Sequence, residues 1–261
     1  MPNKDYTRIV YPLITLAILL FVWEFTIRYF QVPEYIFPSL GSVGKQLYVG
    51  YIEGTMYQHL GFTLQSMVIG YLIGCSLALI LGVLIAESVT FEKFIFPFVV
   101  ALQSTPKVAI APLIMLWCGY GLLSKVVMVA IISFFPLFVN TVAGIRQTDP
   151  ALIRMMRAFS ASSWLTFHRV KLYAAAGHIF AGLQISIVMA LIGAVVGEFV
   201  GSAKGLGWLI QSGMATFNAP IMFAAVLSLI FLGLAFTALV KFAQRKLVYW
   251  DRQPSGAPAK A

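Results

Sequence analysis

Charge is what this 261-residue chain has least of. Asp, Glu, Lys and Arg make up only 10% of it and hydrophobic residues 60%, with a mean hydropathy of +0.90. An average soluble domain is about 25% charged and about 45–50% apolar. So few charges cannot cover the surface of a water-soluble protein of this length. The composition therefore nearly excludes a soluble enzyme and predicts an integral membrane protein.

Cysteine and histidine are also scarce, and their positions exclude two kinds of site. The two cysteines, Cys75 and Cys118, lie within apolar runs and are too few for a disulfide scaffold. The three histidines, His59, His168 and His178, form no H-E-x-x-H motif and no Cys/His pattern suited to a metal. We therefore expect no metal site and no catalytic residues.

Nucleotide-binding motifs are absent as well. The chain has no G-x-x-x-x-G-K-[ST] and no G-x-G-x-x-G after a strand, and the nearest approach, at 41–45, has the wrong spacing. We therefore expect no cofactor on this chain. If the protein uses nucleotide energy, a separate chain must hydrolyse the ATP.

Apolar stretches long enough to cross a membrane follow one another along the chain. A helix needs about 20 apolar residues to cross the hydrocarbon core. The stretches between charges give six such spans: about 9–29, 60–86, 94–117, 122–145, 174–200 and 220–240. No small-residue cleavage site follows the first span, so we interpret it as uncleaved rather than as a signal peptide. The sequence thus predicts an all-α polytopic membrane protein with one transmembrane domain over residues 9–245.

The basic residues predict which side each loop faces. With the N-terminus inside, 13 of the 18 Lys and Arg residues fall in cytoplasmic segments, and both termini (1–8 and 246–261) are cytoplasmic. The outer side has four: Arg28, Lys45, Lys125 and Lys204. The end of the tail has the composition of a disordered segment. This distribution explains the net charge of +9 without a nucleic-acid partner.

The longest predicted cytoplasmic segment, 146–173, has the pattern of two short helices. Asp149-Pro150 is typical of a helix start, and Ser160–Ser163 interrupts the pattern and offers a second N-cap. Between them, apolar side chains recur at helical spacing beside two arginines: Leu152, Ile153, Met156 and Phe159, with Arg154 and Arg157. Such a helical pair could lie on anionic lipid headgroups or dock a cytoplasmic partner, and the residues alone leave both open.

This insertion resembles the E-A-A loop of permease subunits in binding-protein-dependent ABC importers, nearest to the nitrate, sulfonate and taurine branch. Similar segments occur along most of the chain in the order expected of that branch: Trp23-Glu24, Pro38-Ser39, Gln103–Leu113, Gly119–Gly121, Phe134–Gly144, Gly197–Gly201 and Gly205–Gly207. The loop itself is degenerate. Arg154-Met155-Met156 stands where the family has Glu-Ala-Ala, Ser160 where it has glycine, and Leu172-Tyr173 where it has Leu-Pro.

The resemblance implies a type I ABC importer permease fold and a bacterial inner-membrane location. It implies three partners: a second permease, with a homodimer favoured over a heterodimer, a cytoplasmic ABC ATPase dimer that binds ATP-Mg, and a periplasmic or lipid-anchored substrate-binding protein. The chain itself would not be an enzyme. The solute would be a nitrate-, sulfonate- or taurine-like anion or a small heterocyclic precursor. The implied ATPase-coupling residues are Arg154, Met155, Met156, Arg157, Ala158, Phe159, Ser160, Ala161 and Ser162.

Charges and prolines within the apolar stretches suggest part of a translocation pathway. Lys107 lies near the middle of the third span, which contains Pro97, Pro106 and Pro112 and is therefore expected to be broken. A cation there could attract an anionic solute, or it could be structural. We expect Glu198 to pair with Lys107 or Lys204, or to shape a gate. The pathway candidates are Gln103, Ser104, Pro106, Lys107 and Glu198.

Glycines at every fourth position predict close helix packing in the fifth span. Gly193, Gly197 and Gly201 would lie on one helix face, and we expect that face to pack within the subunit rather than at a dimer interface. The alternative functions include a secondary transporter and an intramembrane enzyme. The sequence shows neither inverted repeats nor a cluster of titratable groups at one depth, which disfavours both.

Overall fold

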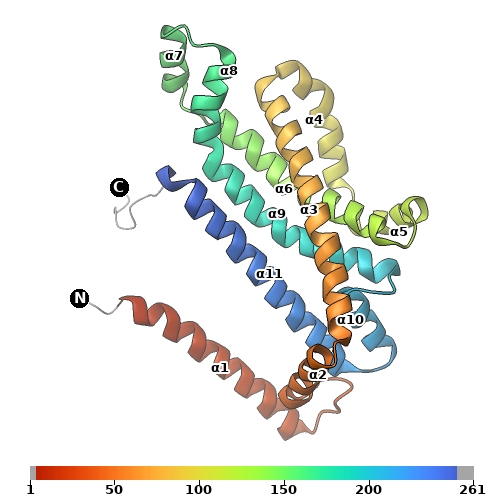
Figure 1. The fold of residues 1–261 in the computed structure, drawn as a ribbon. Coiled ribbons are helices and arrows are strands. Elements are labelled where there is room, and N and C mark those ends of the chain that lie inside the picture. The colour runs from red at the N-terminus through yellow and green to blue at the C-terminus, as the bar shows by residue number, and fades with distance from the viewer. Residues whose placement is uncertain (1–3, 252–261) are drawn as a thin grey trace. The chain divides into compact units, whose positions relative to one another are not determined.

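Helices account for every regular element of the computed structural model, which describes residues 4–251, with the backbone alone for 4–9 and 251 (Figure 1). In chain order they are α1 (Lys4–Phe30), α2 (Leu40–Ile52), α3 (Thr55–Glu87), α4 (Val89–Ser104), α5 (Lys107–Cys118), α6 (Leu122–Arg146), α7 (Pro150–Ala158), α8 (Ser163–Thr166), the π-helix η1 (Phe167–Lys171), α9 (Leu172–Gly201), α10 (Leu206–Ala215), α11 (Ala219–Leu247) and the 3-10 helix η2 (Tyr249–Asp251). The predicted all-α class is confirmed. Residues 1–3 and 252–261, with most of the predicted tail, lie outside the described residues.

Five stretches are long and apolar enough to cross a membrane, and one bent pair of helices makes up to a sixth. The five are Val10–Phe30, Thr55–Glu87, Leu122–Arg146, Ser163–Gly201 and Ala219–Leu247. They coincide with five of the six predicted spans, but α3 begins before residue 60 and α11 continues past 240. The predicted spans end at the first charged residues, but the helices extend farther because helical hydrogen bonding continues through polar residues.

The predicted third span is the bent pair, α4 and α5. The two helices meet at 100° across Thr105 and Pro106. Thr105 is extended (φ −76°, ψ 132°), as expected for a residue that precedes proline. Pro97 and Pro112 lie inside α4 and α5. The predicted break is therefore present, at one of the three prolines.

Two further helices lie between the predicted spans. α2 lies between the first and second of them, and Ser39 caps its first turn by accepting from Ser42 N at 3.2 Å. α10 follows Gly205, whose φ of +115° favours glycine. Both helices are too short to cross a membrane, so hydropathy did not reveal them.

The chain divides into two compact units, and the first has an aromatic interior. This unit comprises Met1–Phe62 and Ala203–Ile230. The Trp23 ring lies 5.1 Å from that of Phe37 and 5.3 Å from that of Phe223. Aromatic side chains thus hold α1, the turn that follows it and the start of α11 together.

The second unit, Thr63–Ser202 with Phe231–Ala261, is organised around α6. α3 approaches α6 closely at a glycine: a Cβ on Gly74 would lie only 2.5 Å from Ala130 O. Buried apolar side chains of α3, α4 and α6 pack beside this contact: Cys75, Ala78, Ile85, Val99, Leu137, Phe138 and Val142. The candidate functional residues of this unit lie on α4 to α9 or in the turns between them.

Candidate functional site

The predicted insertion 146–173 forms a helical hairpin beyond the ends of α6 and α9 (Figure 1). α7 begins where the sequence predicted, because the Asp149 side chain accepts from the backbone N–H two residues on, at 2.7 Å. Ser162 caps α8 by accepting from the N–H three residues on, at 3.2 Å. Local capping by these two residues therefore specifies the hairpin.

Large apolar side chains of the hairpin are open to the surroundings. Phe159 is 78% exposed and Trp164 is 69% exposed, and no residue of α7 is buried. The structure places all nine predicted coupling residues here, with Met156 and Ala161 half-buried and the others exposed. An exposed apolar surface flanked by cations suits contact with a protein partner.

The turn between α7 and α8 depends on one backbone angle. Ser160 has a φ of +53°, in the left-handed region that costs residues other than glycine about 1–2 kcal/mol. Ser160 stands where the E-A-A pattern has glycine. The backbone at this position thus has a conformation that glycine adopts more readily.

Ser160→Gly is expected to stabilise the hairpin by up to about 1 kcal/mol, because it removes the Cβ that disfavours the positive φ. Ser160→Val should destabilise it, since a β-branched residue rarely adopts such an angle. Hydrogen exchange of residues 150–166 would be slower in the first variant and faster in the second. Ser163→Gly, within α8, is the control and should speed exchange. Faster exchange in Ser160→Gly would show that this angle is not the strained feature.

Two ion pairs tie the two ends of the hairpin to the turn between α3 and α4. At the end of α6, Arg146 Nη2 lies 2.7 Å from Glu92 Oε2 and donates to Ile85 O at 3.3 Å. At the end of η1, Lys171 Nζ lies 2.8 Å from both carboxylate oxygens of Glu87. In the sequence, these basic residues indicate only which side of the membrane the loop faces. Their contacts join the hairpin mechanically to α3 and α4.

The pathway candidates of the broken span lie at the joint between α4 and α5. Lys107 is the first residue of α5, and its ammonium donates to Gln103 O, in the last turn of α4, at 3.2 Å. Gln103, Ser104 and Pro106 are exposed. The recess that Lys107 and Gln103 line with Phe134 has a volume of about 10 Å³, which is room for one water. Within this single chain, the recess is thus too small for a solute.

Glu198, the remaining pathway candidate, is fully buried in α9. Its carboxylate accepts from Thr63 Oγ1 of α3 at 2.8 Å. Lys107 donates to Gln103 instead, so these two described residues, Lys107 and Glu198, form no ion pair with each other. The structure thus brings Glu198 to α3 within the second unit.

Lys125, which is predicted on the outer side of the membrane, is a cation whose burial the sequence did not reveal. It is fully buried near the start of α6. Its ammonium donates to Tyr120 O at 2.9 Å, to Ser124 Oγ at 3.3 Å and to Gly201 O. Three oxygens therefore match the three donors of the ammonium, and Glu198 acts electrostatically on the same group.

The glycines at every fourth position of α9 leave the space in which the Lys125 side chain is buried. A Cβ on Gly193 would lie 2.9 Å from Val129 Cα, and one on Gly197 would lie 3.3 Å from Lys125 Cγ. A Cβ on Gly201 would lie 2.7 Å from the Tyr120 ring. All three glycines therefore face α6 or the chain just before it, so their close contacts lie within the subunit.

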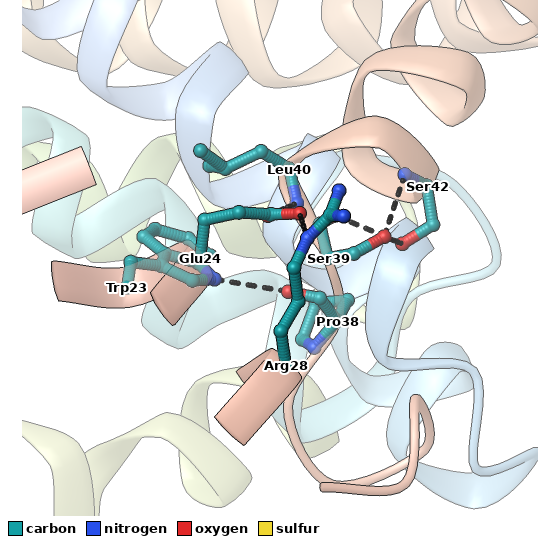
Figure 2. A network of polar contacts seen from close by, with 7 residues as sticks. All are labelled: Trp23, Glu24, Arg28, Pro38, Ser39, Leu40 and Ser42. Carbon is teal, nitrogen blue, oxygen red and sulfur yellow. Dashed lines mark hydrogen bonds and ion pairs between the residues drawn. The ribbon is translucent and has the colours of Figure 1, made fainter. Parts of the chain in front are cut away.

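In the first unit, the Trp-Glu and Pro-Ser pairs of the sequence resemblance meet at one turn (Figure 2). Glu24 pairs with Arg28 Nε at 2.8 Å, four residues on, and its other oxygen accepts from Leu40 N at 3.2 Å. Trp23 Nε1 donates to Pro38 O at 3.0 Å. These residues connect α1 to the start of α2, which gives the motif a structural role.

The described part of the chain contains neither a cluster of metal ligands nor a disulfide. No group of three or more His, Cys, Asp or Glu there could hold a metal ion. Cys75 and Cys118 are both free. The functional features are therefore the hairpin, its two anchors, the broken span and the buried charges.

Membrane-crossing helices, one of them broken, and an exposed hairpin carried between two of them define a membrane-spanning permease subunit. The family model of the binding-protein-dependent transport system inner membrane component matches residues 77–249, from α3 to η2. The chain belongs to this family, and the ABC importer permease predicted from the sequence is confirmed. Such a permease is not catalytic by itself, because the ATPase is a separate subunit.

Known relatives match nearly the whole chain. A probable ABC transporter permease protein of Haemophilus influenzae is 37% identical over 87% of this chain and 92% of its own length. The riboflavin transport system permease protein RibX of Chloroflexus aurantiacus is 35% identical, over 91% and 89%. The formylaminopyrimidine transport permease protein ThiX of Halalkalibacterium halodurans is 30% identical, over 93% and 96%.

A solved structure supports the fold. A chain of the MetNI methionine ABC transporter, in an inward-facing conformation, matches with a TM-score of 0.65 at 20% identity. The match covers 77% of this chain and 99% of that one. At this identity the likeness shows the fold alone, which is that of a type I importer permease.

Proposed function

We propose that two copies of this chain form the membrane channel of an ATP-driven importer in the bacterial inner membrane, with both termini in the cytoplasm. A periplasmic or lipid-anchored binding protein delivers a small solute to the outer face. A cytoplasmic ABC ATPase dimer, which binds ATP-Mg, drives alternating access by pushing on the α7–α8 hairpin. The observation that carries the proposal is this hairpin, which exposes Phe159 and Trp164 and is tied at both ends to α3 and α4.

The hairpin's charge bears on how the ATPase would recognise it. Arg154 and Arg157 are exposed beside the apolar side chains of α7, and Arg154 stands where the family has an acidic residue. A cation there requires an acidic or neutral contact on the ATPase, because like charges at an interface are costly. The cognate ATPase thus carries a matching change in its docking cleft.

A small heterocycle is the solute class that the relatives favour. Two of the relatives most similar to this chain are named for riboflavin and for formylaminopyrimidine, and both are heterocycles. The sequence resemblance to the nitrate, sulfonate and taurine branch supports a small anion as the alternative. Lys107 and its neighbours at the α4–α5 joint are the residues of this chain that we assign to the route.

Lys107→Ala is expected to lower uptake of an anionic solute about fivefold more than uptake of a neutral one. A fivefold difference corresponds to about 1 kcal/mol, the size of one interaction between a partly exposed lysine and an anion. Uptake into proteoliposomes that contain the assembled importer would measure both rates. Lys93→Ala, which removes an exposed lysine of α4, should leave their ratio unchanged. Equal losses for the two solutes in Lys107→Ala would make Lys107 structural.

Purification of the tagged chain in mild detergent tests the function itself. We expect an ATPase in equal copy number, ATP hydrolysis that depends on this chain, and two copies of the permease. A cysteine at position 159 should cross-link to the ATPase. A cysteine at position 116 is the matched control, because Leu116 is also 78% exposed but lies on α5. Absence of an ATPase, with no cross-link from the hairpin, would restore the secondary transporter and the intramembrane enzyme as explanations.

A further inference from the structure

A large groove lies in the second unit at the base of the hairpin, where the His168 ring lies 4.2 Å from that of Trp164. It runs between the start of α9 and the end of α11 and has a volume of about 610 Å³. His168 and Arg169 line one end, and both are exposed. Half-buried apolar side chains of α9, Ile179 and Phe180, line the other.

Specific contacts hold the two sides of the groove together. Trp250 Nε1 donates to Tyr173 O at 3.4 Å, and the two rings lie 4.8 Å apart. Farther along the same pair of helices, Gln184 Nε2 donates to Gln244 Oε1 at 2.6 Å. Hydrogen bonds and ring contacts between α9 and α11 therefore define the shape of the groove.

No side chain that the structure describes neutralises the charge at the basic end. Among the side chains that the structure describes, Arg169 forms no ion pair, and no acidic residue lines the groove. This end of the groove thus attracts anions.

The position of the groove along the helices matches the boundary of a membrane. α9 is predicted to leave the hydrocarbon core near residue 174, so Arg169 lies just outside it and Phe180 inside. The contact between Gln184 and Gln244 places the last turns of α11 at the depth of α9 residues inside this boundary, so α11 leaves the core after the predicted residue 240, near the end of its apolar stretch at Leu247. From Arg169 to Phe180 the helix advances roughly 16 Å. Tyr173 and Trp250 lie between them, as aromatic side chains do at membrane interfaces.

We propose that this groove binds an anionic phospholipid. Arg169 contacts the headgroup phosphate, Tyr173 and Trp250 lie at the glycerol level, and an acyl chain lies along Ile179 and Phe180. The order of basic, aromatic and apolar side chains matches that of a phospholipid, and anionic headgroups are attracted by basic residues at the cytoplasmic surface. A protein segment in the groove would have to reach into the hydrocarbon core, which disfavours it.

Native mass spectrometry of the purified full-length chain, titrated with phosphatidylglycerol or phosphatidylcholine, tests the proposal. We expect a preference for phosphatidylglycerol. Arg169→Gln should weaken phosphatidylglycerol binding about fivefold, the effect of one basic residue near the surface, and leave phosphatidylcholine unchanged. Trp250→Ala should weaken both. Lys93→Gln and Trp117→Ala are the matched controls, because both residues are exposed but do not line the groove.

Three results would overturn the proposal. One is equal binding of the two lipids. Another is the same loss in Lys93→Gln as in Arg169→Gln. The last is full competition by glycerol phosphate at concentrations similar to the lipid, which would make the groove a soluble-anion site. Unfolding midpoints of all variants in the same detergent show that each is folded. Since the test needs neither ATPase nor solute, its failure is distinguishable from failure of the proposed function.

Discussion

Lys125→Met is expected to destabilise the folded chain by about 3 kcal/mol or more, the cost of removing one partner from a buried charged network. The ammonium of Lys125 satisfies the carbonyls of Tyr120 and Gly201 in a fully buried position. Methionine keeps the volume of the side chain but donates no hydrogen bond. It also removes the cation that acts on buried Glu198.

The unfolding midpoint of the purified protein in detergent would measure this effect, with an expected fall of roughly 10 °C. Lys93→Met, at an exposed lysine, should change the midpoint little. Glu198→Gln and the double variant complete a double-mutant cycle, in which the double variant should lose less than the sum of the single ones. Strict additivity would mean that the two charges contribute independently.

Lys171→Glu is expected to lower solute transported per ATP hydrolysed about tenfold, within the range usual for a coupling between two sites. The substitution places a second carboxylate beside Glu87 and so releases one end of the hairpin from the α3–α4 turn. Because the pair is partly exposed, we expect little loss of stability. The loss should therefore be seen in coupling, with the amount of inserted protein maintained.

The exchanged pair, Glu87→Lys with Lys171→Glu, is the decisive variant. It restores opposite charges across the same contact and should recover most of the coupling. Exchanging Arg146 and Glu92 tests the other anchor in the same way. Lys241→Glu, at an exposed lysine of α11, controls for the change in net charge. If the exchanged pairs stayed uncoupled, the contacts would not be the transmitting element.

Features set by local sequence were predictable, and features set by distant contacts were not. The hairpin start at Asp149 and the break beside Pro106 depend on residues next to them in the chain, and both were predicted. α2 is too short for hydropathy to reveal, and its glycines, Gly41 and Gly44, are poor helix formers. Its first turn is held by the local Ser39 cap and by Glu24, which accepts from Leu40 N across 16 residues.

The burial of Lys125 is the clearest case of a feature that depends on residues far away in the sequence. Lys125 follows Tyr120 and Gly121 by a few residues and has the sequence surroundings of a lysine at the membrane surface. It is buried because Gly197 and Gly201, more than 70 residues later, leave room for its stem and offer a carbonyl. One signal was available: Lys125 and Val129 share a helix face.

The π-helical turn η1 makes the number of residues at the base of the hairpin structurally important. Leu172 N donates to Phe167 O, five residues back, between α8 and α9. A π turn closes its hydrogen bond across five residues instead of four, so it takes up one more residue per turn than an α-helix does. Loss of one residue from 167–171 would therefore allow an ordinary α-helical turn and leave Phe159 facing nearly the same direction. Loss of one residue from α9 itself would instead rotate everything before it by about 100° around the helix axis. In relatives of this protein, a single deletion should therefore be tolerated in this stretch far more often than in α9.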